Sequence, residues 1–540
     1  MISVPERHFP DLPTLADDYL HAYSRVREFF DGDFRDPAAF RRQAERVRTR
    51  GLPRETLAAV LIEQNKRFGC GPATIGRIER LVRDRACAVV TGQQAGLFSG
   101  PLYTIYKAFT AVKLAERLTR DGLGCFVPVF WIASEDHDAA EADHICLLDR
   151  EHRPETVHCP LSAAGSKISV SEIQAPPEIA DCIRRISELT VDTEFKAEVL
   201  GALAEDYQTG RLWAEAFARW MTRLFGPRGL IFIDGADPRL KEMGRAVFLR
   251  EIACGSASTP PALDASRMLR EAGYGGQIQL HEGILNLFYS EGGRRTIHRA
   301  GEDFEIKDPP RTFRGDELPS LAGEKPFLFS PNVLLRPVYQ DALLPTVAYV
   351  GGPGEIAYFA QMKGVYEVFG MPMPVIFPRV SATIVESAVD HILKKFGLGV
   401  PDFWREAESL IGDMARERIP AALAGILDQA RSRMEADFEG LTREIAAFEP
   451  TLMDSAALAK GKIDHQWKFL EKKILQAGTK RNETEVRQLR KSAAHLFPDR
   501  RPQERVFNIV PYLLKYGWTL MDVLDRAADV AETGHRIIRI

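Results

Sequence analysis

Cysteine is scarce in this chain and is not arranged as a metal or disulfide framework. The seven cysteines among 540 residues are scattered, and none forms a CxxC pair. A zinc knuckle needs such closely spaced thiolates, so the sequence does not indicate one. An odd number of cysteines in a chain that can bury a large core also argues against a disulfide framework. We interpret most of them as small buried apolar residues.

An excess of charge and a long apolar run are also absent. The chain has 71 basic and 75 acidic side chains, and its net charge of −4 gives no footprint for nucleic acid or an anionic membrane. No apolar run approaches the roughly 18 residues that span a bilayer. Residues Met1–Arg7 lack the apolar region of a signal peptide. We therefore expect a cytoplasmic protein that binds neither nucleic acid nor membrane.

Several common motifs of catalysis and cofactor binding are missing as well. The chain has no GxxxxGK[ST], no GxGxxG after its first predicted strand, no GxSxG and no HExxH. These absences exclude a P-loop and a nucleophile elbow, and they leave a nicotinamide cofactor and a zinc-protease helix without support. The composition, 45% hydrophobic and 27% charged, is that of an ordinary globular protein, and the length predicts two or three structural units.

Five short β-rich runs form the predicted core. Each is a nearly continuous apolar run, as in strands that are buried on both faces. Helical patterns lie between several of them, for example at 102–118 and 213–224, and this alternation predicts an α/β fold with a doubly wound parallel sheet. The runs are Ala88–Thr91, Val127–Ala133, Leu230–Asp234, Thr346–Val350 and Val375–Pro378.

The spacing of these runs predicts the organisation of the first 380 residues. Residues 1–87, helical from about 12 to 84, form the N-terminal part of a core that occupies 88–380. About a hundred residues separate the second run from the third, and the third from the fourth, which is far more than a crossover needs. We therefore expect insertions near 139–212 and 240–330. The second contains Gln277–Leu280 and Leu285–Tyr289, a pattern typical of a small antiparallel hairpin unit.

From about Pro401 the pattern changes to long amphipathic helices. Apolar residues recur every three or four positions from Leu423 to Leu452 and again from Ile463 to Ile474. We expect an antiparallel α-helical coiled-coil arm over 381–500, followed by a segment at 501–540 that returns to the core. The arm has little core of its own, so its apolar seam predicts a homodimer. The alternative is a helical hairpin that packs only on itself.

A glycine-rich turn follows the first predicted strand. The strand ends near Thr91, a loop with three glycines and two glutamines follows, and Pro101 suits the first turn of the next helix. Free amides at such a helix start favour an anion, so we expect a phosphate or carboxylate to bind here, at the carboxyl end of a parallel sheet. The candidate binding residues are Thr91, Gly92, Gln93, Gln94, Gly100, Thr104 and Lys107.

Four ionisable residues in a row follow the second predicted strand. Packing does not explain such a run at the edge of a sheet where these folds bind ligands. The acids could hold an amine or a magnesium-bound phosphate, and the histidine could act as a general acid or base. The alternative is a solvated loop in which Asp138 and Glu141 form a capping box for the next helix. The candidate catalytic residues are Glu135, Asp136, His137 and Asp138, with Trp131 as a binding residue.

A metal site is a further alternative for this region. His137, Glu141 and His144 stand at i, i+4 and i+7, so they would share one face if the segment were helical. Two imidazoles and a carboxylate can ligate zinc, which would make the protein a metal-dependent hydrolase. Our main interpretation assigns no protein-bound metal here.

A third cluster surrounds the end of the fourth predicted strand. Glycines there permit close approach of the backbone to a ligand, and Glu355, Tyr358 and Gln361 lie on roughly one face of the following helix. The alternative is a tight turn in which the helix dipole favours Glu355. Arginines nearby could clamp a carboxylate or phosphate, or make ion pairs within the body. The remaining candidates are Asn332, Arg336, Gly351, Gly352 and Arg379.

The same blocks carry a family resemblance. The chain contains, in order, TGQQAGLFSGPLYTIYKA (91–108), VPVFWIASEDHD (127–138), SPNVLLRPVYQDALLPTVAYVGGPGEIAYFAQ (330–361) and PVIFPR (374–379). It resembles the bacillithiol-biosynthesis protein BshC family, assigned as cysteine ligases. The resemblance implies a Rossmann-like core related to class I nucleotidyltransferases, with insertions and a dimerising coiled coil. It also implies that cysteine is joined through its carboxyl to the amine of glucosaminyl-malate, the last step in making bacillithiol.

Joining a carboxylate to an amine at neutral pH requires activation, so we expect ATP and Mg, through an acyl-adenylate or an acyl-phosphate. The His-x-Gly-His and Lys-Met-Ser-Lys-Ser signatures of class I synthetases are absent, so no synthetase roles are carried over. Charge complementarity suggests that 135–138 hold the cysteine ammonium or deprotonate the sugar amine, and that 351–355 with Arg336 hold malate. A non-catalytic nucleotide-binding scaffold is the remaining alternative.

Overall fold

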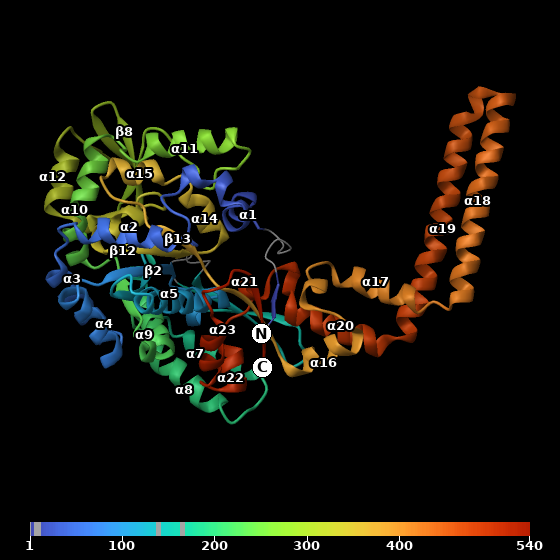
Figure 1. Cartoon of the computed structure of the whole chain (residues 1–540), viewed down its shortest axis with the longest axis horizontal. Helices are drawn as coiled ribbons and strands as arrows, with labels where there is room; N and C mark the ends of the chain where they lie inside the picture. Colours follow the sequence, from blue (N-terminus) through green and yellow to red (C-terminus); the bar gives the residue numbers. More distant parts are fainter. Residues whose placement is uncertain (1, 5–11, 137–141, 162–167) are drawn as a thin grey trace. The chain divides into compact units, whose positions relative to one another are not determined.

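The computed structural model describes residues 2–4, 12–136, 142–161 and 168–540, and Figure 1 shows the whole chain. The chain divides into two compact units. The first contains Met1–Ile384 and Pro502–Arg539, and the second contains Val385–Arg501 with Ile540. Across the described ranges, no helix combines the length and apolarity needed to cross a membrane.

A parallel sheet lies at the centre of the first unit, and all five predicted strands belong to it. The strands are β2 (Cys87–Gln94), β3 (Phe126–Ala133), β6 (Ile231–Asp234), β12 (Thr346–Gly351) and β13 (Val375–Pro378). Their order is β13-β12-β2-β3-β6, and all neighbours pair in parallel. The first of them in the chain, β2, therefore lies in the middle, as in a doubly wound Rossmann-like sheet. The chain reverses direction of winding between β2 and β12, which is where such sheets bind ligands.

Helices from before and between these strands pack on the sheet. Helix α5 (Leu102–Arg120) follows β2 and contacts β2 and β3, and its interior is buried from Leu102 to Leu118. The N-terminal helices confirm the helical pattern predicted for 12–84. They are α1 (Thr14–His21), α2 (Pro37–Arg48), α3 (Arg54–Arg67) and α4 (Pro72–Arg83). Asp36 caps α2 by accepting a hydrogen bond from the Ala38 amide, with Pro37 in the first turn.

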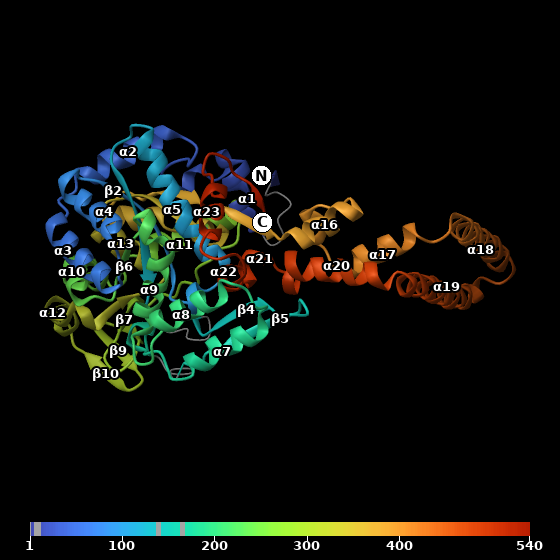
Figure 2. The same cartoon turned by 90° about the horizontal axis from the view of Figure 1, so that it is seen from below.

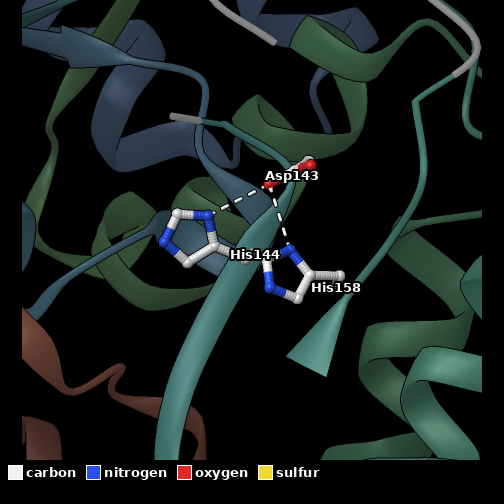
Figure 3. Close-up of side chains that lie close together, drawn as sticks. All are labelled: Asp143, His144 and His158. Atoms are coloured by element: carbon white, nitrogen blue, oxygen red, sulfur yellow. Dashed lines mark hydrogen bonds and ion pairs between the residues drawn. The ribbon is translucent and has the colours of Figure 1, made fainter. Parts of the chain in front are cut away.

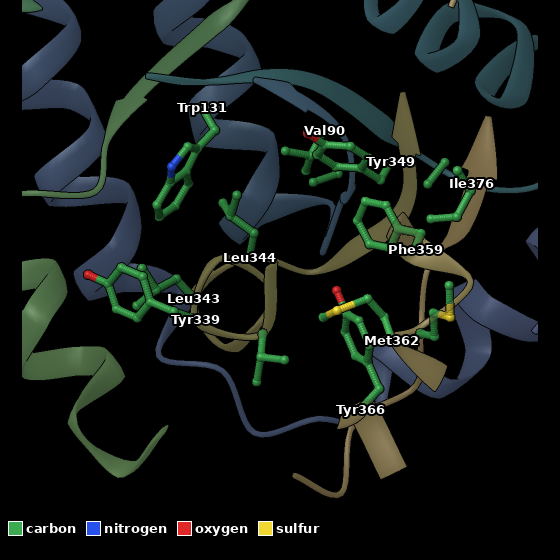
Figure 4. Packing of buried hydrophobic residues seen from close by; sticks show 14 of the residues in the cluster. Val90, Trp131, Tyr339, Leu343, Leu344, Tyr349, Phe359, Met362, Tyr366 and Ile376 are labelled. Atoms are coloured by element: carbon green, nitrogen blue, oxygen red, sulfur yellow. The ribbon is translucent and has the colours of Figure 1, made fainter. Parts of the chain in front are cut away.

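Large buried side chains from the sheet and the helices around it pack against one another in the core (Figure 4). Trp131 is 2% exposed, and its ring meets the ring of Tyr339 edge-on with centroids 5.7 Å apart. A Cβ at Gly235 would lie 2.2 Å from the Trp131 ring, and a Cβ at Gly92 would lie 2.8 Å from the Trp131 carbonyl oxygen. Glycine at 235 therefore leaves room for the indole, and glycine at 92 lets β2 lie close to the backbone of β3 at Trp131. The Trp131 ring therefore packs in the core, and the prediction that this residue contacts a ligand stays a prediction.

The insertion after β3 contains a small hairpin and two helices. The hairpin pairs β4 (His144–Leu148) with β5 (Pro154–His158) in antiparallel register. The helices are α7 (Ile179–Leu189) and α8 (Lys196–Asp206), which precede α9 (Trp213–Phe225) and the return to β6.

The insertion after β6 is larger than the predicted hairpin unit. After α10 (Pro238–Ala253) and α11 (Thr259–Glu271), it forms an antiparallel sheet of order β10-β9-β8-β7-β11. Gln277–Leu280 is not one of its strands, because the amides of Gln277 and Ile278 both donate to Gln361 Oε1 at 3.0 Å and not to a neighbouring strand. The strands are β7 (Ile284–Tyr289), β8 (Arg295–Ala300), β9 (Asp303–Lys307), β10 (Pro310–Phe313) and β11 (Phe329–Pro331).

The C-terminal residues complete the first unit. Strand β15 (His535–Arg539) lies between β1 (Ile2–Val4) and β14 (Ser381–Val385) in a small separate sheet. Before it, α21 (Gln503–Val506) contacts α5. This segment therefore contacts the helix that follows the glycine-rich turn.

The second unit contains two long helices that fold back on each other. Helices α18 (Ala421–Phe448) and α19 (Met453–Arg481) are joined by a 3-10 turn at Pro450–Leu452 and lie side by side in Figures 1 and 2. Arg431 and Glu471 link them with a 3.3 Å ion pair. The predicted antiparallel helical arm is confirmed. Several of its apolar side chains stay exposed, among them Phe448 at 85% and Ile426 at 64%.

Candidate functional site

A buried ion pair joins the ends of β2 and β12. Lys107, in the second turn of α5, is 2% exposed, and its Nζ lies 2.6 Å from Glu355 Oε2. The same ammonium donates to the Gly92 carbonyl at 2.6 Å and to Gln93 Oε1 at 3.2 Å. The glycine-rich turn and the 351–355 turn, far apart in sequence, are therefore linked directly by Lys107.

Glu355 is held as a carboxylate. It is the third residue of α14 (Pro353–Phe359), and its Oε2 accepts the Gly352 amide at 2.8 Å while its Oε1 accepts the Tyr349 hydroxyl at 2.7 Å. Burial alone would raise the pKa of Glu355, but the Lys107 charge, the Gly352 amide and the Tyr349 hydroxyl together hold this pKa below its ordinary value. The expected helix-start position of Glu355 is thus observed, with Lys107 as an added partner.

The glycine-rich turn itself is clamped by residues from distant segments. The Tyr207 hydroxyl accepts the Phe98 amide at 2.9 Å, and the Trp213 indole donates to the Ala95 carbonyl at 2.7 Å. Asn508 Nδ2 donates to the carbonyls of Phe98 and Gly100 at 3.0 and 2.6 Å. The amide of Leu102, the first residue of α5, donates to the Phe507 carbonyl at 2.8 Å.

The sequence predicted that the amides at the start of α5 bind a phosphate or carboxylate. These contacts occupy part of the backbone that such an anion would use. The first amide of α5 is already used by the C-terminal segment, and Gly100 and Thr104 are buried. The Thr104 hydroxyl is enclosed without a hydrogen-bond partner among the described residues. Of the predicted residues in this block, Thr91 donates to the Val350 carbonyl of β12 at 3.0 Å, and Gly92 and Gln93 are linked to Glu355 through Lys107.

The acidic run after β3 divides into two environments. Glu135 forms an ion pair with Lys241 of α10 and is 16% exposed, whereas Asp136 is 49% exposed and its Oδ1 lies 2.9 Å from Arg294 Nη1. His137 and Asp138 lie outside the described residues. Asp136 is therefore the described acid of this run that presents a carboxylate to solvent.

Burial shifts the Glu135–Lys241 pair towards its neutral forms. It raises the pKa of Glu135 and lowers the pKa of Lys241, and each charge opposes the shift of the other. The Lys241 ammonium lies 4.8 Å from the Tyr339 ring centroid, above the core aromatics. Glu135 therefore contacts Lys241 at the carboxyl ends of the parallel strands, which we call the rim of the sheet, and its predicted catalytic role stays a prediction.

Arg336 brings the third cluster to the other two. Its Nη2 donates to the Tyr358 hydroxyl at 2.9 Å and its Nη1 to Gln340 Oε1 at 3.1 Å. Burial would lower the pKa of Arg336, but the nearby Tyr358 and Tyr349, together with Glu355 and Asp136, raise it. The Arg336 guanidinium also lies 5.9 Å from the ring centroid of Tyr349, whose hydroxyl donates to Glu355, so Arg336 and Glu355 share one neighbour at the end of β12.

Three predicted residues have structural partners elsewhere. Asn332 accepts the amides of Leu334 and Leu335 at 3.0 and 3.2 Å. Gln361 is buried and donates to Ser266 at 2.7 Å in addition to its contacts with 277–278. Arg379 pairs with the buried Glu504 at 2.6 Å, although a Cβ at Gly352 would still lie 3.3 Å from Arg379 Nε. Asn332 and Gln361 therefore secure the insertion after β6, and Arg379 secures the C-terminal segment.

Two cations at the rim were missed by the sequence interpretation. Arg294 is 5% exposed, and besides Asp136 it contacts the Ser330 hydroxyl at 3.1 Å and the Pro331 carbonyl at 2.7 Å. Lys241 lies in the first turn of the helix that follows β6, much as Lys107 lies early in the helix that follows β2. A lysine on the buried face of a helix after a parallel strand was the available signal for Lys241.

The helical metal alternative is wrong at one of its residues. His144 is the first residue of β4, so it cannot share a helical face with His137 and Glu141. The last two lie outside the described residues. His144 instead lies beside Asp143 and His158 (Figure 3).

Two family models together match nearly the whole chain. "Bacillithiol biosynthesis BshC, N-terminal Rossmann-like domain" matches residues 2–380, and "Bacillithiol biosynthesis BshC, C-terminal coiled-coil domain" matches 382–540. This chain belongs to the BshC family. The Rossmann-like sheet and the helical arm described above are the two parts that these models name.

Curated relatives in the BshC family are similar over almost their full length. "Putative cysteine ligase BshC" of Salinibacter ruber is 37% identical, covering 98% of this chain and 96% of the relative. The proteins of the same name from Chlorobaculum tepidum and Solibacter usitatus are 36% and 31% identical, covering 95% and 99% of this chain and 94% and 99% of the relatives. The chain is accordingly a ligase, and the hydrolase and scaffold alternatives gain no support from these relatives.

Proposed function

We propose that this BshC-family ligase joins the carboxyl of L-cysteine to the amine of glucosaminyl-malate, the last step in making bacillithiol. The observation that carries the proposal is the set of charged groups at the carboxyl ends of β2, β3 and β12: the Lys107–Glu355 pair, Arg336 held by Tyr358, and the half-exposed Asp136 beside Arg294. An amino acid and a malate-bearing sugar amine present ammonium and carboxylate groups, and a rim of acids and guanidinium groups complements both.

Asp136 is the residue that we assign to the amine. It is the half-exposed acid of the rim, and its buried partner Arg294 is anchored to Ser330 and Pro331. A carboxylate fixed in this way can hold the cysteine ammonium, or take the proton that the sugar amine loses as the amide forms. We assign the amine to Asp136 and not to Glu135, because Lys241 already pairs with the Glu135 carboxylate.

Arg336 is the residue that we assign to malate. Its guanidinium is oriented by Tyr358 and Gln340, each through a single hydrogen bond, and Arg carries five N–H donors in a planar fork. Gly351 and Gly352 stand just before Glu355, whose charge acts on Arg336. The malate carboxylates then match the guanidinium, and the glycines allow the ligand to approach the chain.

The proposal includes ATP with magnesium, because a free carboxylate is unreactive towards an amine at neutral pH. Mg²⁺ is usually held by one or two carboxylates together with substrate phosphates, and Asp136, beside Arg294, is the half-exposed carboxylate that could take this role in place of holding the amine. When bound, the nucleotide would supply the activation of the cysteine carboxyl. The chain itself would orient the two substrates and accept the proton.

Reconstitution tests the proposed function. Full-length protein is supplied with cysteine, glucosaminyl-malate and ATP, and the amide product is followed by mass spectrometry. We expect product with the wild type, with loss on omitting ATP and in Asp136→Asn. Asp316→Asn, a matched change at an exposed aspartate without a side-chain cap bond, should behave as the wild type. ATP binding without product under any condition would contradict the proposal.

We also propose that the arm pairs with a second copy of the chain. Helices α18 and α19 leave apolar side chains such as Phe448, Leu458 and Ile426 exposed, and covering them would be favourable. Light scattering on the full chain of 60.5 kDa should give the mass of two chains. A monomeric mass at high micromolar concentration would contradict this pairing.

A further inference from the structure

A carboxylate and two imidazoles meet at the open end of the hairpin of β4 and β5 (Figure 3). His144 and His158 are directly opposite each other in the antiparallel register, so their rings lie side by side with centroids 5.2 Å apart. Asp143 Oδ1 lies 3.0 Å from His144 Nδ1 and 3.6 Å from His158 Nδ1. One ligand atom from each residue can be chosen so that all lie within 4.8 Å of one another.

We propose that Asp143, His144 and His158 form a site for a divalent transition metal ion of the zinc type. Zinc binds imidazole nitrogen and carboxylate oxygen at about 2.0–2.2 Å in tetrahedral geometry, which puts neighbouring ligand atoms about 3.3–3.5 Å apart. The separations of 3.0 and 3.6 Å fall on either side of that range. Small rotations of the side chains would therefore bring the three ligands onto one ion.

The two imidazoles and the carboxylate determine which metal ions this site favours. Imidazole nitrogen suits zinc, copper, nickel and iron, whereas magnesium and calcium prefer all-oxygen ligands. The side chains of Asp143, His144 and His158 are 20%, 41% and 61% exposed, so an ion can enter from solvent and keep a fourth position for water or another ligand.

The backbone around the site is already fixed. The Asp143 carbonyl accepts the Cys159 amide at 2.7 Å, which ties the residue before β4 to the residue after β5. Cys182 of α7 donates its thiol to the His158 carbonyl at 3.2 Å. A metal ion would then bind side chains whose backbone is already held in place. The conformational entropy lost on binding is therefore smaller.

The test uses metal-free full-length protein titrated with Zn²⁺ in a calorimeter. We expect one Zn²⁺ per chain, and at least about 100-fold weaker binding in His144→Ala and in His158→Ala. Mg²⁺ should not compete. His281→Ala, an exposed histidine outside the cluster, and Cys254→Ser, the exposed thiol, serve as matched controls and should bind as the wild type.

Two further measurements use the wild type and so do not depend on whether a variant folds. Co²⁺ should give the intense visible absorption of a four-coordinate site with nitrogen and oxygen ligands, and Zn²⁺ should raise the Tm. Absence of stoichiometric Zn²⁺ binding to the wild type would overturn the proposal. So would affinity that is unchanged in both histidine variants, or that is lost in Cys254→Ser.

Discussion

Lys107 and Glu355 form a 2.6 Å ion pair that connects the helix after β2 with the helix after β12, at the point where the winding of the sheet reverses. The lysine side chain is 2% exposed and that of the glutamate 23%. Their pairing positions Gly92 and Gln93 on one side and Gly352 on the other. The Lys107–Glu355 pair therefore fixes the two turns at this end of the sheet, where the candidate residues Arg336 and Asp136 also lie.

Removing Lys107 should destabilise the first unit. In Lys107→Met the Glu355 carboxylate loses its charge partner, and breaking such a buried pair costs about 3–5 kcal/mol. The free energy of unfolding in urea should fall by that amount. Lys113→Met is the matched control: Lys113 and its partner Asp525 are each about a quarter exposed, so the loss should stay below about 1 kcal/mol. Equal losses in the two variants would contradict this role of Lys107.

Stability at acidic pH should depend on Glu355. Its folded pKa lies below the ordinary value of 4.5, so the folded state binds this proton less readily than the unfolded state. The stabilisation is therefore present above about pH 4.5 and is lost as the pH falls through the lower folded pKa. In Glu355→Gln the free energy of unfolding should be lower at neutral pH and fall less steeply as the pH drops below about 4.5. Parallel pH profiles for variant and wild type would rule this out.

Glu135 and Lys241 should show strong coupling in a double-mutant cycle. Either single change, Glu135→Gln or Lys241→Met, leaves the other member of the pair buried without its partner and should lower the free energy of unfolding. Making the second change in a single variant should cost less than making the same change in the wild type. We expect a coupling free energy of about 1–3 kcal/mol, measured by chemical denaturation. Additive effects of the two changes would show that the pair does not act as a unit.

Asp136→Asn should separate activity from stability. The Asp136 side chain is half-exposed, and asparagine keeps an oxygen to which the buried Arg294 can still donate, so the change should cost about 1 kcal/mol or less of folding free energy. A group that accepts a proton or holds the reacting amine contributes about 10²–10⁴-fold to the rate. The kcat/KM for glucosaminyl-malate should therefore fall by about that factor while the Tm changes little. A large loss of Tm with a proportionate loss of activity would assign Asp136 a structural role.

Arg336→Lys should raise the KM for glucosaminyl-malate more than the KM for cysteine. Lysine keeps the charge but loses the planar fork of donors, and a charge-assisted hydrogen bond is worth about 1.5–3 kcal/mol, or roughly 10–100-fold in affinity. Tyr358→Phe, which removes one support of the guanidinium, should have a smaller effect in the same direction. Equal changes in both KM values would contradict the assignment to malate.

The sequence predicted the parallel sheet because its strands are continuous apolar runs, which need no knowledge of the rest of the chain. It also singled out Asp136 and Glu355, as acids that follow buried strands, and Arg336, as an arginine that could clamp a carboxylate or phosphate; their functional roles stay predictions. It could not predict the ion pairs that Glu135 and Asp136 make with Lys241 and Arg294. Lys241 and Arg294 lie in different parts of the chain between β6 and β12, and their ion pairs depend on how these parts pack back onto the sheet.

Tertiary contacts also add what the interpretation of single segments could not include. The helix start after Gly100 has the local pattern of an anion site, but Phe507 and Asn508 occupy its backbone groups from the other end of the chain. The spacing of His137, Glu141 and His144 has a helical period, but His144 pairs with His158 across a hairpin. Neither contact can be deduced from residues that are close in sequence.

A crystal structure with glucosaminyl-malate bound tests most directly whether the ends of β2, β3 and β12 form one substrate site. We predict that the malate carboxylates lie within hydrogen-bond distance of Arg336 and that the sugar amine faces Asp136. A ligand bound elsewhere on the chain, contacting neither residue, would contradict this assignment.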